Sequence, residues 1–197
     1  MKKMTCHTRL WAGGLLGLSL LAGACGDTSD TSATNAPSAT TATSDAGGAG
    51  KTVTVTATDY KFEGLPKTMK EESTKLTLTN TSTKEVHELV AFRIPDAEKR
   101  PVSELVKLPE AEQEALFPKG PPPLVLVAPP NGAPQIIALG DGTLKEKGRY
   151  MVTCFIPTGA DPAAYLKAME AATDGPPEVP GGPPHLTQGM FGEIIVT

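Results

Sequence analysis

The sequence predicts an all-β protein, a Greek-key β-sandwich with short helical insertions. Apolar residues alternate with polar ones over much of the chain, most clearly in 52–58, where Val53, Val55 and Ala57 alternate with threonines. That alternation is typical of a half-buried strand. The apolar runs are short and separated by Gly and Pro, which favours a sandwich over a parallel α/β fold. Helical spacing is confined to two segments.

We expect about seven short strands. In 75–79 the alternation recurs, with Leu76 and Leu78 directed inward. Two runs are more uniformly apolar, as is typical of central strands that are buried on both faces. The predicted strands are 52–58, 75–79, 86–94, 124–127, 135–139, 149–155 and 193–196.

Helical insertions are expected near 101–123 and 158–184. The first contains a weak apolar face over 102–117, interrupted by Pro109. In the second, Asp161 and Pro162 predict an N-cap followed by proline at the first helical position, with the helix continuing over 163–173. Its apolar positions are suited either to a lid packed on the sandwich or to a docking surface, and they are Tyr165, Leu166, Met169 and Ala172.

Residues 1–24 have the order of a secretory signal peptide: a basic start, an apolar core over 10–24 and small residues at the end. The core is too short to span a membrane as a permanent helix. Leu-Ala-Gly-Ala-Cys25 resembles the bacterial lipobox, which implies lipidation of Cys25, although its Leu lies four residues before Cys instead of three. Ordinary cleavage near Ala24 is the alternative, and it would leave Cys25 as a plain thiol.

Residues 25–50 are expected to be a disordered tether that starts at the lipidated Cys25, because 26–50 lack large apolar side chains. Dense Thr and Ser also fit glycosylation, though linker composition accounts for them. The folded domain is then 51–197. Beyond residue 24 the chain carries 15 basic and 22 acidic residues, a net charge of 15 − 22 = −7. This argues against nucleic-acid binding and suits solubility or attraction of a basic partner.

The chemically informative residues of the folded part are one cysteine, two histidines and a methionine near the C-terminus: Cys154, His87, His185 and Met190. Tyr150, Val152 and Cys154 alternate along one predicted strand and so share its inner face. A trigonal His₂Cys set with a weak axial Met is the ligand set of blue-copper electron-transfer sites. Each residue also has a simpler interpretation, because a strand Cys or His is often only a core residue. A lone unpaired thiol is nevertheless unusual in an exported protein.

The chain resembles the plastocyanin/azurin-like cupredoxins across 51–197. The resemblance is carried by 146–154 (EKGRYMVTC), by HLTQGM from His185 to Met190 with the strand after it, and by 80–90. It implies His87, Cys154 and His185 as equatorial ligands of one type 1 copper and Met190 as the axial ligand. In the family only a few residues separate Cys from the second His, whereas 30 separate Cys154 from His185. This insertion could cover His185 or form a new docking surface.

The cupredoxin resemblance implies a protein that transfers single electrons. Together with the signal peptide, the lipobox-like segment and the tether, it predicts a membrane-tethered protein outside the cytoplasm of a bacterium, on the cell surface or in the periplasm. The partners would be a cytochrome or an oxidase, the chain would be a monomer, and a solvent-near His185 edge would be the electron exit. An alternative is a cupredoxin-like binding module that carries or senses copper, or holds no metal, and docks a partner through its insertions. A copper enzyme is disfavoured because a second copper centre would need more histidines than the two available.

Overall fold

The computed structural model describes residues 50–117, 119–173 and 175–197. The predicted signal peptide, Cys25 and all but the last residue of the predicted tether lie outside the described residues. Within the described part of the chain, no helix is both long enough and apolar enough to cross a membrane.

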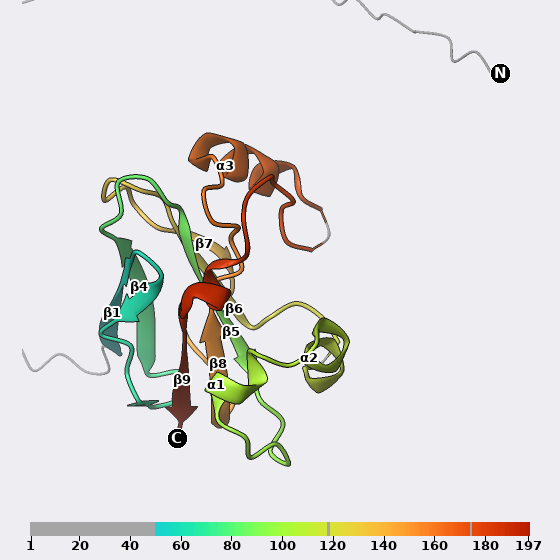
Figure 1. Ribbon diagram of the computed structural model, residues 1–197. Helices are drawn as coiled ribbons and strands as arrows, with labels where there is room; N and C mark the ends of the chain where they lie inside the picture. The colour runs from blue at the N-terminus through green and yellow to red at the C-terminus, as the bar shows by residue number, and fades with distance from the viewer. Residues whose placement is uncertain (1–49, 118, 174) are drawn as a thin grey trace, which may run out of the picture. The chain divides into compact units, whose positions relative to one another are not determined.

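Two β-sheets pack face to face, with β1 and β4 in one layer and β5, β8 and β9 in the other (Figure 1). In the described residues the smaller sheet has the order β2-β1-β4 and the larger one β3-β9-β8-β5-β6-β7. The two-sheet sandwich predicted from the sequence is confirmed. The strands are β1 (Lys51–Thr58), β2 (Lys61–Glu63), β3 (Thr68–Met69), β4 (Thr74–Asn80), β5 (His87–Arg93), β6 (Leu124–Ala128), β7 (Ile136–Leu139), β8 (Gly148–Thr153) and β9 (Phe191–Val196).

All seven predicted strands are present, with ends that differ by up to two residues. The sequence did not predict β2 and β3. These strands have three and two residues, which is too short for a periodic pattern to be visible. Both strands are held in place by backbone pairing, β2 with β1 and β3 with β9.

The alternation of apolar residues and threonines in β1 and β4 gives each strand one apolar face and one polar face, as expected. The two strands pair in parallel, with Val53 opposite Leu76 and Val55 opposite Leu78. The apolar side chains face the large sheet, and the threonines form an outward ladder in which the Thr77 hydroxyl lies 3.0 Å from that of Thr54. One face of this sheet is therefore apolar and the other polar, as in antiparallel sheets with one solvated face.

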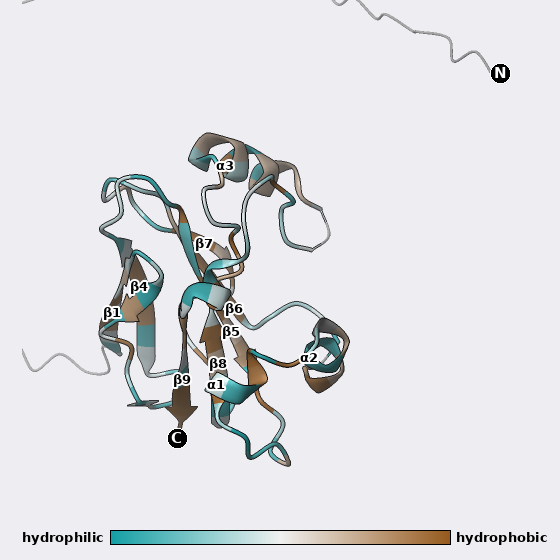
Figure 2. Ribbon diagram, in the orientation of Figure 1, coloured by the Kyte–Doolittle hydropathy of each residue, from teal (hydrophilic) through white to brown (hydrophobic). Residues whose placement is uncertain are grey.

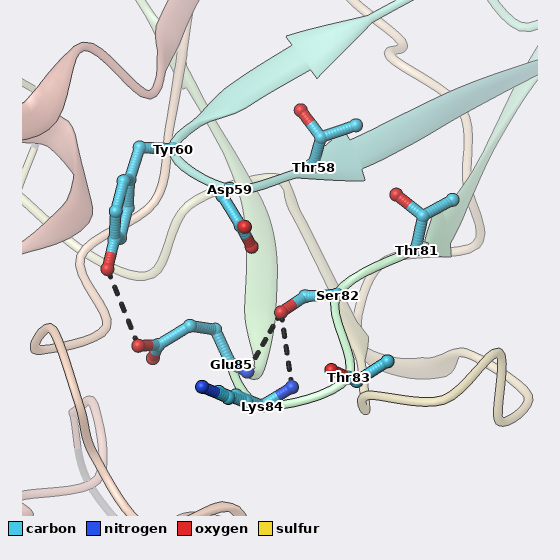
Figure 3. A pocket seen from close by; sticks show the side chains of 8 residues that line it. All are labelled: Thr58, Asp59, Tyr60, Thr81, Ser82, Thr83, Lys84 and Glu85. Atoms are coloured by element: carbon cyan, nitrogen blue, oxygen red, sulfur yellow. Dashed lines mark hydrogen bonds between the residues drawn. The ribbon is translucent and has the colours of Figure 1, made fainter.

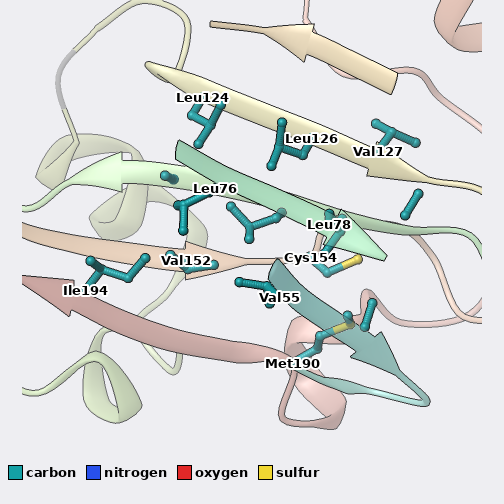
Figure 4. Close-up of a cluster of buried hydrophobic side chains, with 14 of the residues drawn as sticks. Val55, Leu76, Leu78, Leu124, Leu126, Val127, Val152, Cys154, Met190 and Ile194 are labelled. Carbon is teal, nitrogen blue, oxygen red and sulfur yellow. The ribbon is translucent and has the colours of Figure 1, made fainter. Parts of the chain in front are cut away.

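The main core lies between the sheets, and apolar residues predominate along β5, β8 and β9 (Figure 2). Within it, Cys154 and Met190 lie at one end, with Leu124 and Ile194 toward the other (Figure 4). Tyr150 and Val152 share this core with Cys154, whereas Met151 belongs to a second cluster on the opposite face of the large sheet. The predicted inner row of β8 is thus confirmed.

The helical insertions cover the large sheet at two places. The first forms two helices, α1 (Val102–Leu105) and α2 (Glu110–Leu116), with Pro109 directly before α2. Their apolar side chains pack against the second hydrophobic cluster. The other contains α3 (Pro162–Ala171), capped by the Asp161 carboxylate, which accepts a hydrogen bond of 2.7 Å from Ala164 N–H. Tyr165 of α3 is buried in the main core. At Tyr165, therefore, α3 packs as a lid on the sandwich.

Asn80 joins the two sheets at the end where β5 begins. Its buried amide donates to the carbonyl oxygens of Glu85 at 2.8 Å and Ala128 at 2.9 Å, and its Oδ1 accepts from Ser82 N–H at 2.8 Å. These bonds fix the turn between β4 and β5. Since His87 is the first residue of β5 and pairs with Ala128, Asn80 also fixes the start of the strand that carries His87.

We expect Asn80→Ala to lower the free energy of unfolding by about 2–4 kcal/mol, because it leaves a buried N–H and two carbonyl oxygens without their partners. Urea unfolding followed by circular dichroism measures this loss. Thr83→Ala, in the same turn but exposed, should change stability by less than about 0.5 kcal/mol. Equal stabilities of the two variants would contradict the role given to Asn80.

Candidate metal centre

Three side chains from three separate segments converge at one end of the sandwich. His87 begins β5, Cys154 follows β8, and His185 begins the 3₁₀ helix η1 (His185–Gln188). His87 Nδ1 lies 3.2 Å from His185 Nδ1, and Cys154 Sγ lies 3.3 Å from His185 Nδ1. All three potential ligand atoms lie within 4.8 Å of one another. The residues singled out from the sequence are thus brought together.

The spacing of these atoms fits a single metal ion. Nitrogen and sulfur ligands at about 2.0–2.3 Å from one ion lie roughly 3.3–3.7 Å apart. The measured separations of 3.2 and 3.3 Å are close to that range. The Nε2 atoms of His87 and His185 are buried and form no hydrogen bond with the described residues. Such a set of one thiol and two imidazoles is suited to a soft transition metal.

A backbone ladder brings Cys154 and His185 together despite the 30 residues between them. His185 N–H donates to the Ile156 carbonyl at 3.0 Å, and Leu186 N–H donates to that of Cys154 at 2.9 Å. Farther out, Thr158 pairs with Pro183 and with Gly182 through bonds of 3.1 and 2.8 Å. At Gly181 a side chain would collide with Pro157. The insertion is therefore closed at its base, so its length does not separate the two candidate ligands.

Met190 is fully buried and tied to the same two residues. Its N–H donates to the His185 carbonyl at 3.2 Å, and its carbonyl accepts from Cys154 N–H at 3.2 Å. Gly189 makes the intervening turn with a φ of 106°, in the left-handed region. Because glycine has no Cβ, it adopts this conformation at little cost. The axial role of Met190 stays a prediction, supported by this position.

Burial governs the protonation of the three groups. Burial, followed by the neighbouring His185, lowers the pKa of His87 to about 4. Burial likewise lowers the pKa of His185 and raises that of the Cys154 thiol, with the nearby Glu88 carboxyl adding to the rise. The imidazoles are thus neutral and able to coordinate, and a bound cation would convert the thiol to the thiolate.

Glu88 is a buried carboxyl beside the centre, and it was not identified from the sequence. Its N–H donates to Cys154 Sγ at 3.4 Å, and its two oxygens accept from Phe155 N–H at 3.0 Å and from the Tyr165 hydroxyl at 3.0 Å. Tyr165 lies on α3, so this carboxyl links the insertion to the strand of Cys154. An acidic residue between His87 and the apolar run LVAF was the signal that could have identified it.

The expectation of a solvent-near His185 edge was wrong, because His185 is 0% exposed. The ring of Tyr60 lies edge-on against it, with the ring centroids 5.0 Å apart. Glu85 Oε2 lies 3.5 Å from His185 Nε2. Glu85 in turn accepts from Gly159 N–H at 3.2 Å, so a residue of the insertion holds the cover in place. Tyr60 and Glu85 carry no motif and were not identified from the sequence.

Comparisons with known proteins find auracyanins among the similar solved structures. Neither a family model nor a curated protein matches this chain. The reduced auracyanin of Roseiflexus castenholzii is 17% identical, with a TM-score of 0.40 over 76% of this chain and 99% of its own. Auracyanin A, a "blue" copper protein of Chloroflexus aurantiacus, is 13% identical, with a TM-score of 0.36 over 74% and 99%. Auracyanin B is 16% identical, with a TM-score of 0.31 over 75% and 88%. The functional assignment therefore depends on the geometry of this chain.

We expect Tyr165→Phe to lower the free energy of unfolding by about 1–3 kcal/mol, because it removes a hydrogen bond to a buried carboxyl. Tyr150→Phe is the matched control. It also removes a hydroxyl, but one that donates to the Glu146 carbonyl far from the carboxyl, and we expect it to cost about 0.5–1.5 kcal/mol. Urea unfolding measures both losses. A loss in Tyr165→Phe no larger than that in Tyr150→Phe would contradict the link between α3 and Glu88.

Proposed function

We propose that this protein is a type 1 copper protein of the cupredoxin kind that transfers single electrons. His87, Cys154 and His185 would be the equatorial ligands and Met190 the axial one. The observation that carries the proposal is the convergence of one thiol and two imidazole Nδ1 atoms, all buried, at one end of a two-sheet sandwich. This is the ligand set of blue-copper electron-transfer sites.

The surroundings of these residues suit electron transfer. Copper held by a thiolate and two imidazoles supplies a one-electron couple between Cu(II) and Cu(I). The ligands come from β5, from the residue after β8 and from the ladder-closed loop, so hydrogen-bonded backbone holds each of them in place. A fixed donor set needs little rearrangement when the charge of the site changes. The N–H of Glu88 donates to Cys154 Sγ, and such hydrogen bonds tune the metal.

The proposed cellular setting follows from the N-terminal residues. A signal peptide over 1–24, a lipid on Cys25 and a tether over 26–50 would hold the domain 51–197 outside the cytoplasm at a bacterial membrane. Redox proteins at the same membrane, such as a cytochrome or an oxidase, would be its partners. The order of features in the sequence supports this setting.

The burial of the ligands favours an electron carrier over a protein that delivers copper. His87, Cys154, His185 and Met190 are each 0% exposed. Delivery of copper requires a recipient's ligands to reach the metal, which would mean opening the packed end of the sandwich. Electrons can pass through a closed cover, whereas copper ions cannot. A permanently bound ion is therefore the better fit to this site.

The proposal is tested by the visible absorption spectrum of the protein titrated with Cu(II). We expect an intense blue thiolate-to-copper band that saturates at a stoichiometric amount of copper. Cys154→Ser should abolish the band, and Cys25→Ser, which changes a thiol outside the described residues, should retain it. Copper binding without the blue band, or a band that survives Cys154→Ser, would rule out the proposed site.

We expect Met190→Leu to retain the blue band and to raise the reduction potential, because the axial ligand tunes the potential and a thioether stabilises Cu(II) more than an alkyl group does. Protein-film voltammetry measures the change. Met151→Leu is the matched control, since Met151 is equally buried but lies in the cluster on the other face of the sheet. If the two variants have equal potentials, Met190 is not an axial ligand.

A further inference from the structure

Because His185 is buried, electrons have to pass through the side chains that cover its ring, which are those of Tyr60 and Glu85. His87, Cys154 and Met190 are also 0% exposed. Of the residues around His185, Tyr60 is half-buried and Glu85 has a side chain that is 14% exposed. Both touch solvent on one side and approach the imidazole on the other. The cover at this point is therefore a single layer of side chains.

Tyr60 and Glu85 also line a cavity of about 350 Å³ on the surface (Figure 3). Its other lining residues are Thr58, Asp59, Thr81, Ser82, Thr83 and Lys84. The Tyr60 hydroxyl points toward the Glu85 carboxylate and donates to it at 3.4 Å. The two side chains that cover His185 are thus also part of the wall of this cavity.

The backbone at Tyr60 is strained in a way that marks this position. Thr58 and Lys61 pair across a two-residue turn, Asp59-Tyr60, that joins β1 to β2. Tyr60 has a φ of 64°, in the left-handed region where Gly or Asn is usual in such turns and a bulky residue is an outlier. Strain of this kind persists where surrounding contacts impose it and is concentrated at functional sites. Here the contacts are those with His185 and Glu85.

The charges at the cavity select the chemistry of what can dock there. Asp59 and Glu85 contribute two carboxylates, and Lys84 contributes one ammonium group. The folded residues 51–197 carry 15 basic and 19 acidic side chains, a net charge of 15 − 19 = −4. Both the cavity and the domain therefore favour a positively charged surface.

We propose that electrons enter and leave the metal centre through the Tyr60–Glu85 wall of this cavity, and that a redox partner protein docks there with a cationic side chain. This inference rests on the proposed copper centre. Tyr60 acts as a cover that keeps His185 dry and sets the shortest approach to it. Each transfer moves one electron between the copper couple and the partner, and no proton or ligand is exchanged.

Oxidation of the reduced full-length protein by two small reagents tests the route. Tris(phenanthroline)cobalt(III) is a trication and hexacyanoferrate(III) a trianion, and each accepts one electron, giving Co(II) or Fe(II). We expect Tyr60→Asn, which suits a positive φ, to oxidise severalfold faster with both reagents because the His185 edge becomes accessible. Tyr60→Phe, which keeps the ring, should match the unaltered protein. Unchanged rates in Tyr60→Asn would overturn the route.

The charge preference is tested with Asp59→Asn. At low ionic strength this variant should react roughly two- to fivefold more slowly with the trication and correspondingly faster with the trianion. Asp141→Asn removes an exposed carboxylate from the loop beside Leu76, near the start of β4, and should change neither rate. Equal effects of the two substitutions would overturn docking at this cavity.

A readout that needs no copper accompanies these rates. In the metal-free protein, hexaamminechromium(III), a paramagnetic trication without redox activity, should broaden the amide resonances of Asp59, Tyr60 and Glu85 before others. Broadening centred elsewhere would overturn the docking site. The unaltered protein and each variant are first titrated with Cu(II). Absence of the blue band in the unaltered protein would refute the copper centre itself. A normal band in the variants together with unchanged oxidation rates would refute only the route.

Discussion

The closed ladder between 154–158 and 182–186 is the constraint on which the rest of the structure depends. It places the N–H groups of His185 and Leu186 on the carbonyls of Ile156 and Cys154. Loop closure costs entropy that grows only slowly with length, so a long excursion is tolerable once its base is paired. The separation of Cys154 and His185 is set by this base, which leaves the chain beyond it able to form α3.

The helix of this insertion, α3, is connected to the Cys–His centre by a hydrogen bond. Tyr165 reaches from α3 to the Glu88 carboxyl, whose other oxygen accepts from Phe155 N–H. A buried carboxyl without partners would cost several kcal/mol, so α3 and Glu88 require each other. Because the Glu88 N–H also donates to Cys154 Sγ, the position of α3 and the environment of the sulfur are connected through one residue.

The sequence predicted the fold and the converging Cys and His side chains because both leave local signals. Alternating Val and Thr reveal β1, and a lone Cys with two His reveals the centre even though β5 and η1 are far apart in the chain. The cover of His185 left no such signal. Tyr60 and Glu85 meet it only because the β1–β2 turn, the β4–β5 turn and Gly159 of the insertion converge in space, and no pattern within any one of these segments encodes that meeting.

In the proposed electron transfer, a complete cover would also change how the surface selects a partner. A redox reagent can approach an exposed imidazole edge directly. Here the ring lies behind an aromatic side chain and a carboxylate, and the surface outside them is a polar hollow with two carboxylates and one ammonium group. Electrostatic complementarity acts mainly on association rate and on the exclusion of wrong partners. In the proposed route, covering His185 would leave partner selection to the charges of the Asp59–Glu85 cavity.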